Sequence, residues 1–160
     1  MKITIRRAGL TDLKTIQRLS YLLFKKEHVE YDSTLDATWT FGKKGTKYFT
    51  DVLKKGFAAI AEADGKTVGY IVGGKLPPYS YRTTKRTAEL GNMFIVKGYR
   101  KKGIGTKLIR AFLEWCKKEG CKHIEIEAFA ANKKGIKFYH KFGFKDYALL
   151  LEMNPENKRV

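Results

Sequence analysis

Residues 90–119 read Leu-Gly-Asn-Met-Phe-Ile-Val, Lys-Gly-Tyr, Arg-Lys-Lys-Gly-Ile-Gly and then a long stretch of helical pattern. Met93–Val96 is a short apolar run with β-branched and aromatic residues, which is typical of a buried strand. From Ile104 onward, apolar residues recur every three or four positions, as on one face of a helix, until Gly120 ends the pattern. The stretch therefore predicts a strand, a basic glycine loop and a helix, in that order.

The loop between this strand and this helix has the features of an anion-binding site. The first turn of a helix presents unpaired backbone N–H groups and the positive end of the helix dipole. Gly103 and Gly105 carry no Cβ, so an anion can approach the backbone closely, and Arg100, Lys101 and Lys102 add positive charge. The loop suits a phosphate or pyrophosphate, although glycines before a helix can also form no more than a tight turn.

Two common nucleotide-binding motifs do not fit the loop. A P-loop requires Gly-Lys-Ser/Thr, but Gly105 is followed by Thr106 and Lys107. The dinucleotide fingerprint requires a third glycine, near the position that Ile109 occupies.

A second run, residues 132–144, reads Asn-Lys-Lys-Gly-Ile-Lys-Phe-Tyr-His-Lys-Phe-Gly-Phe. Asn132 is a favourable N-cap for a helix, and Tyr139 lies on the apolar face of that helix. An aromatic residue at such a position is usually part of a core. The hydroxyl group of Tyr139, which its neighbour Phe138 lacks, allows a chemical role as well.

Taken together, the two runs resemble the GCN5-related N-acetyltransferases (GNAT). The family's main motif is a strand ending in Val, a short loop and Arg/Gln-x-x-Gly-x-Gly/Ala at the start of a helix, as found here after Val96. Its second motif places Tyr seven residues after Asn, as Asn132 and Tyr139 are placed. The resemblance implies an α/β (α+β) GNAT fold, in which about four helices flank a central, mixed, mostly antiparallel twisted sheet of six to seven strands. We expect one N-acetyltransferase domain over residues 1–153 and a basic tail over residues 154–160.

The resemblance further implies acetyl-coenzyme A as the cosubstrate, with no metal. The loop amides would bind the pyrophosphate, and the edge of the strand would hydrogen-bond to the pantetheine arm, which the family's Asn also contacts. The cofactor-binding residues implied in this way are Phe94, Ile95, Val96, Arg100, Lys101, Lys102, Gly103, Ile104, Gly105, Thr106, Asn132 and Tyr139.

Acetyl transfer to an amine requires an acid and a base. The departing thiolate needs a proton or a hydrogen bond, which the matching Tyr supplies in the family, so Tyr139 is the candidate acid. A carboxylate can accept the proton of the amine. Glu127 is our first candidate, because it lies five residues before Asn132, where the similar protein N-terminal acetyltransferases that act on ribosomal proteins have a glutamate base. Glu89 on the central strand is the second, although strand glutamates are usually solvated.

The remaining chain is predicted to form further strands and helices around these two runs. Asp64-Gly65 is a strong signal for a two-residue hairpin. A loop at residues 79–86 interleaves basic residues with Tyr79 and Tyr81, which is compatible with nucleic-acid binding, although we favour a solvated hairpin loop. The other expected strands are the N-terminal segment around Ile3 and Ile5, Phe57–Ala63, Thr67–Gly74, Ala88–Val96, Lys122–Phe129 and Lys145–Met153.

The charge of the chain is unusual, because 33 Lys and Arg stand against 16 Asp and Glu, a formal net charge of +17. Such a field attracts polyanions and disfavours a polycationic acceptor. It can serve coenzyme A, an acidic protein, a ribosome or nucleic acid, or it can be a lysine-rich surface of a heat-adapted organism.

We therefore expect an N-acetyltransferase that acts on a primary amine by direct attack in a ternary complex. A protein N-terminal or lysine amine is the preferred acceptor, with an acidic protein or a ribonucleoprotein as its carrier. A small-molecule amine acetyltransferase and an inactive GNAT-like module that binds nucleic acid or ribosomes are the alternatives. No apolar run is long enough to span a membrane, and we expect a cytoplasmic protein, with a homodimer left open.

Overall fold

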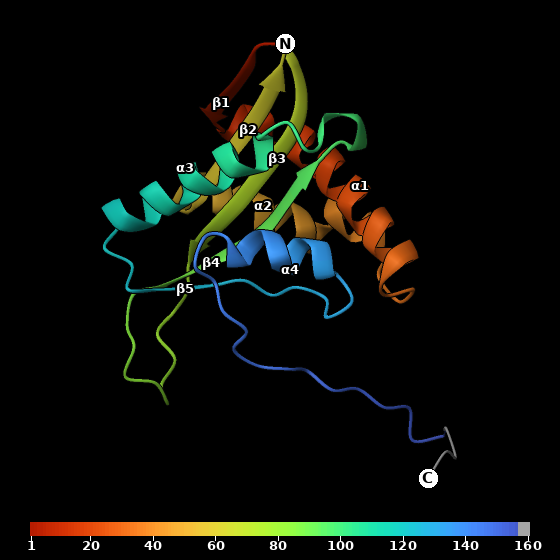
Figure 1. The fold of residues 1–160 in the computed structure, drawn as a ribbon, viewed down its shortest axis with the longest axis vertical. Coiled ribbons are helices and arrows are strands. Elements are labelled where there is room, and N and C mark those ends of the chain that lie inside the picture. Colours follow the sequence, from red (N-terminus) through yellow and green to blue (C-terminus); the bar gives the residue numbers. More distant parts are fainter. Residues whose placement is uncertain (157–160) are drawn as a thin grey trace. The chain divides into compact units, whose positions relative to one another are not determined.

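Five strands form a single sheet in the order β1-β2-β3-β4-β5 in the computed structural model, which describes residues 1–156 (Figure 1). Neighbouring strands are antiparallel from β1 to β4, whereas β4 and β5 are parallel. The expected mixed, mostly antiparallel sheet is confirmed. The strands are β1 (Ile3–Arg7), β2 (Phe57–Ala63), β3 (Lys66–Lys75), β4 (Thr87–Ile95) and β5 (His123–Glu125).

Four α-helices accompany the sheet, which confirms the expected number. Three short 3-10 turns, at Leu10–Asp12, Ala37–Phe41 and Lys97–Tyr99, connect helices and strands. The helices are α1 (Leu13–Glu30), α2 (Lys43–Lys55), α3 (Ile104–Lys118) and α4 (Lys133–His140).

The described chain falls into two compact units. The first, Met1–Glu127, contains the whole sheet with α1, α2 and α3, and the second begins at Ala128 and contains α4.

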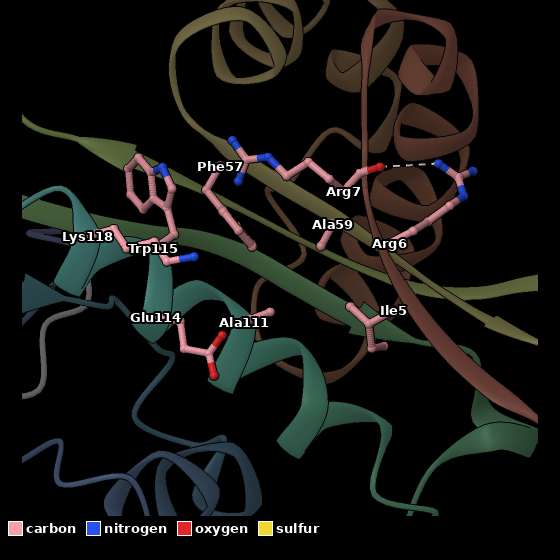
Figure 2. Close-up of a pocket in the computed structure, with 9 residues that line it drawn as sticks. All are labelled: Ile5, Arg6, Arg7, Phe57, Ala59, Ala111, Glu114, Trp115 and Lys118. Atoms are coloured by element: carbon pink, nitrogen blue, oxygen red, sulfur yellow. Dashed lines mark hydrogen bonds between the residues drawn. The ribbon is translucent and has the colours of Figure 1, made fainter.

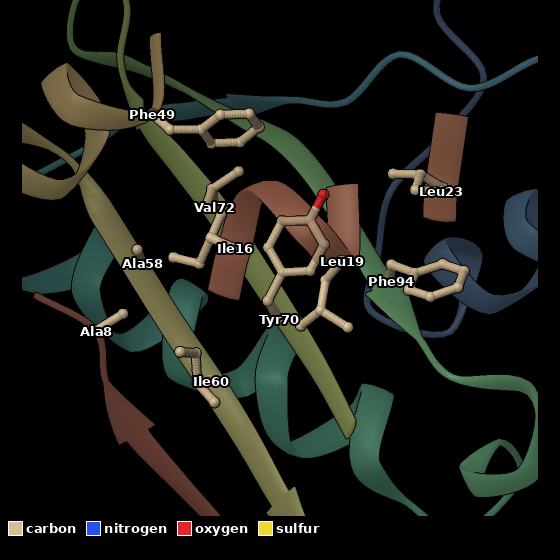
Figure 3. Close-up of a cluster of buried hydrophobic side chains, with 10 residues drawn as sticks. All are labelled: Ala8, Ile16, Leu19, Leu23, Phe49, Ala58, Ile60, Tyr70, Val72 and Phe94. Carbon is tan, nitrogen blue, oxygen red and sulfur yellow. The ribbon is translucent and has the colours of Figure 1, made fainter. Parts of the chain in front are cut away.

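The core of the first unit follows from the alternation of side chains along the strands. On one face of the sheet, Tyr70 and Val72 of β3 pack with residues of α1 and α2 (Figure 3). On the other face, Phe57 of β2 contacts Phe112 of α3, with their ring centroids 5.8 Å apart. Both faces of the sheet are therefore covered by helices. The buried cluster on the α1 and α2 side comprises Ala8, Ile16, Leu19, Leu23, Phe49, Ala58, Ile60, Tyr70, Val72 and Phe94.

Two glycines shape the middle strands. At the β2–β3 hairpin, Asp64 (φ 48°) and Gly65 (φ 78°) both adopt positive φ, as a two-residue type I′ turn requires, so the predicted hairpin is confirmed. In β4, Leu90 and Asn92 pair with consecutive residues of β3, which leaves Gly91 as a bulge. An added Cβ at Gly91 would overlap the hydroxyl of Tyr48.

The expected count of six to seven strands is wrong for the described residues, because the sheet has five strands. Lys122–Phe129 was expected to be a strand throughout, but only His123–Glu125 pairs with β4. Lys145–Met153 forms no strand. It pairs with no strand among the described residues, and its large apolar side chains from Tyr147 to Met153 are 75–86% exposed.

The predicted central strand and main helix are confirmed within one or two residues at each end. The basic tail expected at residues 154–160 lies partly outside the described residues, since these end at residue 156. Within the described chain we find no helix with the length and apolarity needed to span a bilayer.

Candidate active site

Among the described residues, the C-terminal half of β4 pairs with a strand on one side only. On the β5 side, pairing is limited to Thr87–Glu89, whereas on the β3 side β4 is paired up to Ile95. Val96 N donates to Val68 O at 2.9 Å, which fixes the alternation of hydrogen bonds along this edge. Because antiparallel pairs alternate, the backbone groups of Met93 and Ile95 point away from β3, toward the open side.

The predicted pantetheine-binding residues thus differ in orientation. Ile95 directs its backbone groups toward the open side, while Phe94 and Val96 use theirs on β3. Arg100 reaches back from the loop, because its Nε donates to the carbonyl of Ile95 at 2.8 Å and its guanidinium lies 5.4 Å from the centre of the Phe94 ring. Arg100 therefore holds the basic loop against the C-terminal end of β4.

The loop itself has an unusual backbone. Gly103 adopts φ 78° and ψ −1° as the N-cap of α3, and Lys101 has φ 60°. A positive φ is uncommon for a residue with a side chain and is found mostly where function or a tight turn requires it. An added Cβ at Gly103 would meet no atom within 4 Å, so the glycine is needed for its backbone conformation and not for internal packing.

The helix that follows presents its first amides to this loop. Lys107 N donates to the carbonyl oxygen of the N-cap residue, Gly103, at 3.1 Å. The amides before Lys107, including those of Gly105 and Thr106, are the ones a helix leaves without intrahelical partners. Ile104 is 1% exposed and anchors this turn in the core. The residues present fit a pyrophosphate, since the free amides of a helix N-terminus follow a loop that carries Arg100, Lys101 and Lys102, all exposed or half-exposed.

A group of carboxylates lies at the point where β4 and β5 separate. Glu89 and Glu125 are the last residue pair of the parallel ladder, and Glu127 follows two residues later. Burial raises the pKa of Glu89, and the charges of Glu125 and Glu127 raise it further. Of the two predicted bases, Glu89 is half-buried and Glu127 is exposed.

Two tyrosines that the sequence did not point to as catalytic residues lie near this group, and one of them hydrogen-bonds to it. Tyr48 of α2 is near Glu89, and burial, followed by the charge of Glu89, raises the pKa of Tyr48 to about 12. The hydroxyl of Tyr79 donates to Glu125 Oε2 at 3.0 Å. The isolated glycine at position 91, inside a strand pattern, was the available signal for the bulge against which Tyr48 packs. No sequence signal pointed to Tyr48 itself.

Asn132 and Tyr139 belong to the second unit. Asn132 Oδ1 accepts a hydrogen bond from the Gly135 amide at 3.0 Å, so Asn132 caps α4 as its sequence predicts. Tyr139 is half-buried, and its ring lies edge-on to Phe138 and to Phe144, with centroids 5.4 Å and 6.0 Å away.

A separate groove lies along β1 and α3 and has a volume of about 290 Å³. Its floor includes Phe57, with Arg7 stacked 4.3 Å above the ring and Trp115 5.7 Å away (Figure 2). Arg7 also donates to the Gly56 carbonyl at 2.7 Å. None of the predicted site residues lines this groove, so the candidate site is the open edge of β4 and not this depression.

Comparison with known families identifies the family of the chain. The model of the acetyltransferase (GNAT) family matches residues 16–144, a span that includes β4, the basic loop and both predicted motifs. The chain belongs to the GNAT family.

Proteins that are similar in sequence or in structure are named N-acetyltransferases. The chain is 29% identical over 144 residues to an uncharacterized N-acetyltransferase of Methanocaldococcus jannaschii, covering 89% of this chain and 61% of that protein. It is 28% identical over 153 residues to an N-alpha-acetyltransferase of Sulfurisphaera tokodaii, covering 91% and 82%. An aminoglycoside N-acetyltransferase solved in complex with coenzyme A has the same fold, with a TM-score of 0.73, 19% identity and coverage of 99% and 96%.

Proposed function

We propose that the chain is an N-acetyltransferase that moves the acetyl group of acetyl-coenzyme A to a primary amine, with a protein N-terminal or lysine amine as the acceptor. The observation that carries this proposal is the open edge of β4, which runs from Glu89 to the basic glycine loop. A carboxylate with a raised pKa, an open strand edge and a basic glycine turn follow one another along this strand, in the order that an amine and acetyl-coenzyme A would need.

The chain would hold the cosubstrate at two places. The amides of residues 101–106, with Arg100, Lys101 and Lys102, would bind the pyrophosphate. The backbone of Ile95 would hydrogen-bond to the pantetheine arm on the open side of β4, and Asn132 would contact the same arm. A thioester held in this way needs only positioning, contacts to the developing oxyanion and proton transfer in order to react.

Glu89 is the stronger candidate for the base, ahead of Glu127. The acceptor enters mainly as an ammonium ion, and the base must take its proton before or during attack on the thioester carbon. The raised pKa of Glu89 makes its carboxylate a better proton acceptor than an ordinary exposed one. Tyr139 would give its hydroxyl proton to the coenzyme A thiolate as the C–S bond breaks and the new C–N bond is completed.

A small-molecule amine is the second candidate acceptor. Three carboxylates at residues 89, 125 and 127 create a local negative charge within a chain of net charge +17. They would attract a compact cation, despite the repulsion expected from the net charge. The aminoglycoside enzyme with the same fold acts on a molecule of this type.

Two measurements test the proposal. Acetyl-coenzyme A at about 100 times its dissociation constant should add roughly 2.7 kcal/mol to the free energy of unfolding, with or without magnesium. Thiol release from acetyl-coenzyme A should then depend on an amine drawn from a panel of N-terminal peptides, lysine peptides and polyamines. The proposal fails if millimolar acetyl-coenzyme A does not change the melting temperature and no amine stimulates thiol release.

A further inference from the structure

The loop between β3 and β4, residues 76–86, combines positive charge with exposed aromatic rings. It extends past the ends of its two strands (Figure 1, light green). Residues 76–86 include three Lys or Arg residues and no Asp or Glu. This segment is therefore a local concentration of the charge that gives the whole chain its net +17.

Three side chains of this loop form a stacked group. The rings of Tyr79 and Tyr81 lie 5.6 Å apart at an angle of 37°. The guanidinium of Arg82 lies 5.0 Å from the centre of the Tyr79 ring and 5.7 Å from that of Tyr81. The arrangement holds a cation against two aromatic faces.

The base of the loop is fixed, which keeps this group in place. Arg82 N donates to Tyr79 O at 3.2 Å, closing a turn around Tyr81. Tyr79 is held through its hydroxyl by Glu125 of β5. Lys122 N donates to Arg86 O at 3.0 Å, which ties the far end of the loop to the same region. A surface that is preorganised in this way loses little entropy when it binds a partner.

The outermost ring is not part of any core. Tyr81 is 77% exposed, although a tyrosine usually buries most of its ring. Internal packing therefore does not explain why an aromatic residue stands at this position. An exposed ring beside a held cation is the combination with which proteins bind single-stranded nucleic acid, since bases stack on the ring and phosphates contact the cations.

We propose that the β3–β4 loop binds single-stranded nucleic acid, with a base stacked on Tyr81 and the adjoining phosphates on Arg82, Lys85 and Arg86. Nucleic acid is favoured over an acidic peptide because it supplies a planar face and a regular row of anions together. The carboxylate of Glu125 is engaged by the Tyr79 hydroxyl at the base of the loop, and Tyr81 and Lys85 are exposed. The proposal does not depend on the proposed acetyl transfer.

The first test measures the contribution of the Tyr81 ring. Fluorescence anisotropy of a labelled single-stranded 12-nucleotide RNA would be recorded at low salt, with saturating acetyl-coenzyme A to occupy the glycine loop. Tyr81→Ala should weaken binding about 5- to 150-fold, the effect of losing one stacked base, whereas Tyr81→Trp should keep it. Because the ring is exposed, the melting temperature of both variants should stay close to that of the parent.

The second test separates this loop from the general charge of the surface. Lys85→Gln should reduce the slope of log affinity against log salt by about 0.7, the value for one phosphate contact on a single strand. Lys66→Gln, an exposed lysine at the β2–β3 hairpin, is the matched control and should leave the slope nearly unchanged.

Three results would overturn the proposal. The first is absence of RNA binding by the parent at low salt. The second is equal affinity of the parent and Tyr81→Ala. The third is an equal loss when heparin or an acidic peptide replaces the RNA, because those polyanions have no bases to stack and would show that the loop recognises charge alone.

Discussion

Glu89 of β4 and Glu125 of β5 lie opposite each other as the last pair of the parallel ladder. Two carboxylates in this position repel each other, and beyond them the two strands no longer pair. The parallel pairing therefore ends at a half-buried glutamate, Glu89, beside two further carboxylates, Glu125 and Glu127. A carboxylate whose ionisation costs folding stability, next to an unpaired strand edge, is typical of a functional site.

Replacing Glu89 with Gln should stabilise the fold at neutral pH. The folded protein holds the pKa of Glu89 above its usual 4.5, so ionising it costs stability above the folded pKa and costs nothing below 4.5. We expect a gain of about 0.2–1 kcal/mol at pH 7, the range for cross-strand charge pairs, and no gain at pH 4. Urea unfolding at the two pH values measures this, with the exposed Glu127→Gln as a control that should gain less. A Glu89→Gln variant less stable than the parent at pH 7 would contradict the assignment.

Gly103→Val should impair the binding of acetyl-coenzyme A. A Val at φ 78° is strained by at least the 1–2 kcal/mol of a left-handed residue, and its branched side chain would occupy the space beside the loop amides. Gly98→Ala is the matched control in the same segment, because a Cβ there meets no atom within 4 Å and its φ is not positive. Calorimetric titration should show lost binding in the first variant and retained binding in the second. Normal binding by a folded Gly103→Val would show that the pyrophosphate is held elsewhere.

Gly91→Ala should destabilise the protein, and Tyr48→Phe should relieve part of that loss. The new Cβ would overlap the Tyr48 hydroxyl, and overpacking of this kind costs about 1–3 kcal/mol. Removing the hydroxyl makes room for the methyl group. A double-mutant cycle by denaturant unfolding measures the coupling, which should be at least about 0.5 kcal/mol in the favourable direction. Additive effects of the two changes would mean that the bulge yields without contact to Tyr48.

Tyr139→Phe should lower turnover more than it weakens binding of acetyl-coenzyme A. The change keeps the ring that packs against Phe138 and Phe144 and removes only the proposed proton donor. General acid catalysis contributes about 10²–10⁴ in rate, and a thiolate can leave with less help than an alkoxide, so we expect the lower end. Turnover with an active amine and cofactor affinity are measured side by side. Unchanged turnover, with chemistry rate-limiting, would return Tyr139 to a packing role.

The strand, loop and helix of residues 90–119 were predictable because each carries a strong local signal. The hydrophobic period changes from strand to helix across the loop, and two glycines and a run of cations mark the change. The Asp64-Gly65 hairpin was predictable for the same reason, since few residues tolerate two consecutive positive φ values. The length of β5 and the absence of a strand at Lys145–Met153 were not predictable, because pairing depends on a neighbouring strand that local sequence does not specify.

The candidate site could be predicted in its residue types but not in its contacts. Gly103 and Arg100 stand out in the sequence, yet the hydrogen bond from Arg100 to the Ile95 carbonyl requires the fold. In the sequence, Glu89 is one of several strand glutamates, and only the register of β4 and β5 shows that it lies opposite Glu125. Tyr48 lies 41 residues away from Glu89 in an unrelated helix, and only packing brings them close.

The partial pairing of β4 also bears on how the protein can associate with other chains in solution. On the open side of β4, the backbone groups of Met93 and the amide of Ile95 have no strand partner among the described residues, and an unpaired strand edge can pair with another extended chain. The pantetheine arm of coenzyme A carries amide groups of its own and would compete for the same backbone groups. Acetyl-coenzyme A bound as we propose would therefore also shield this edge from pairing with a second molecule.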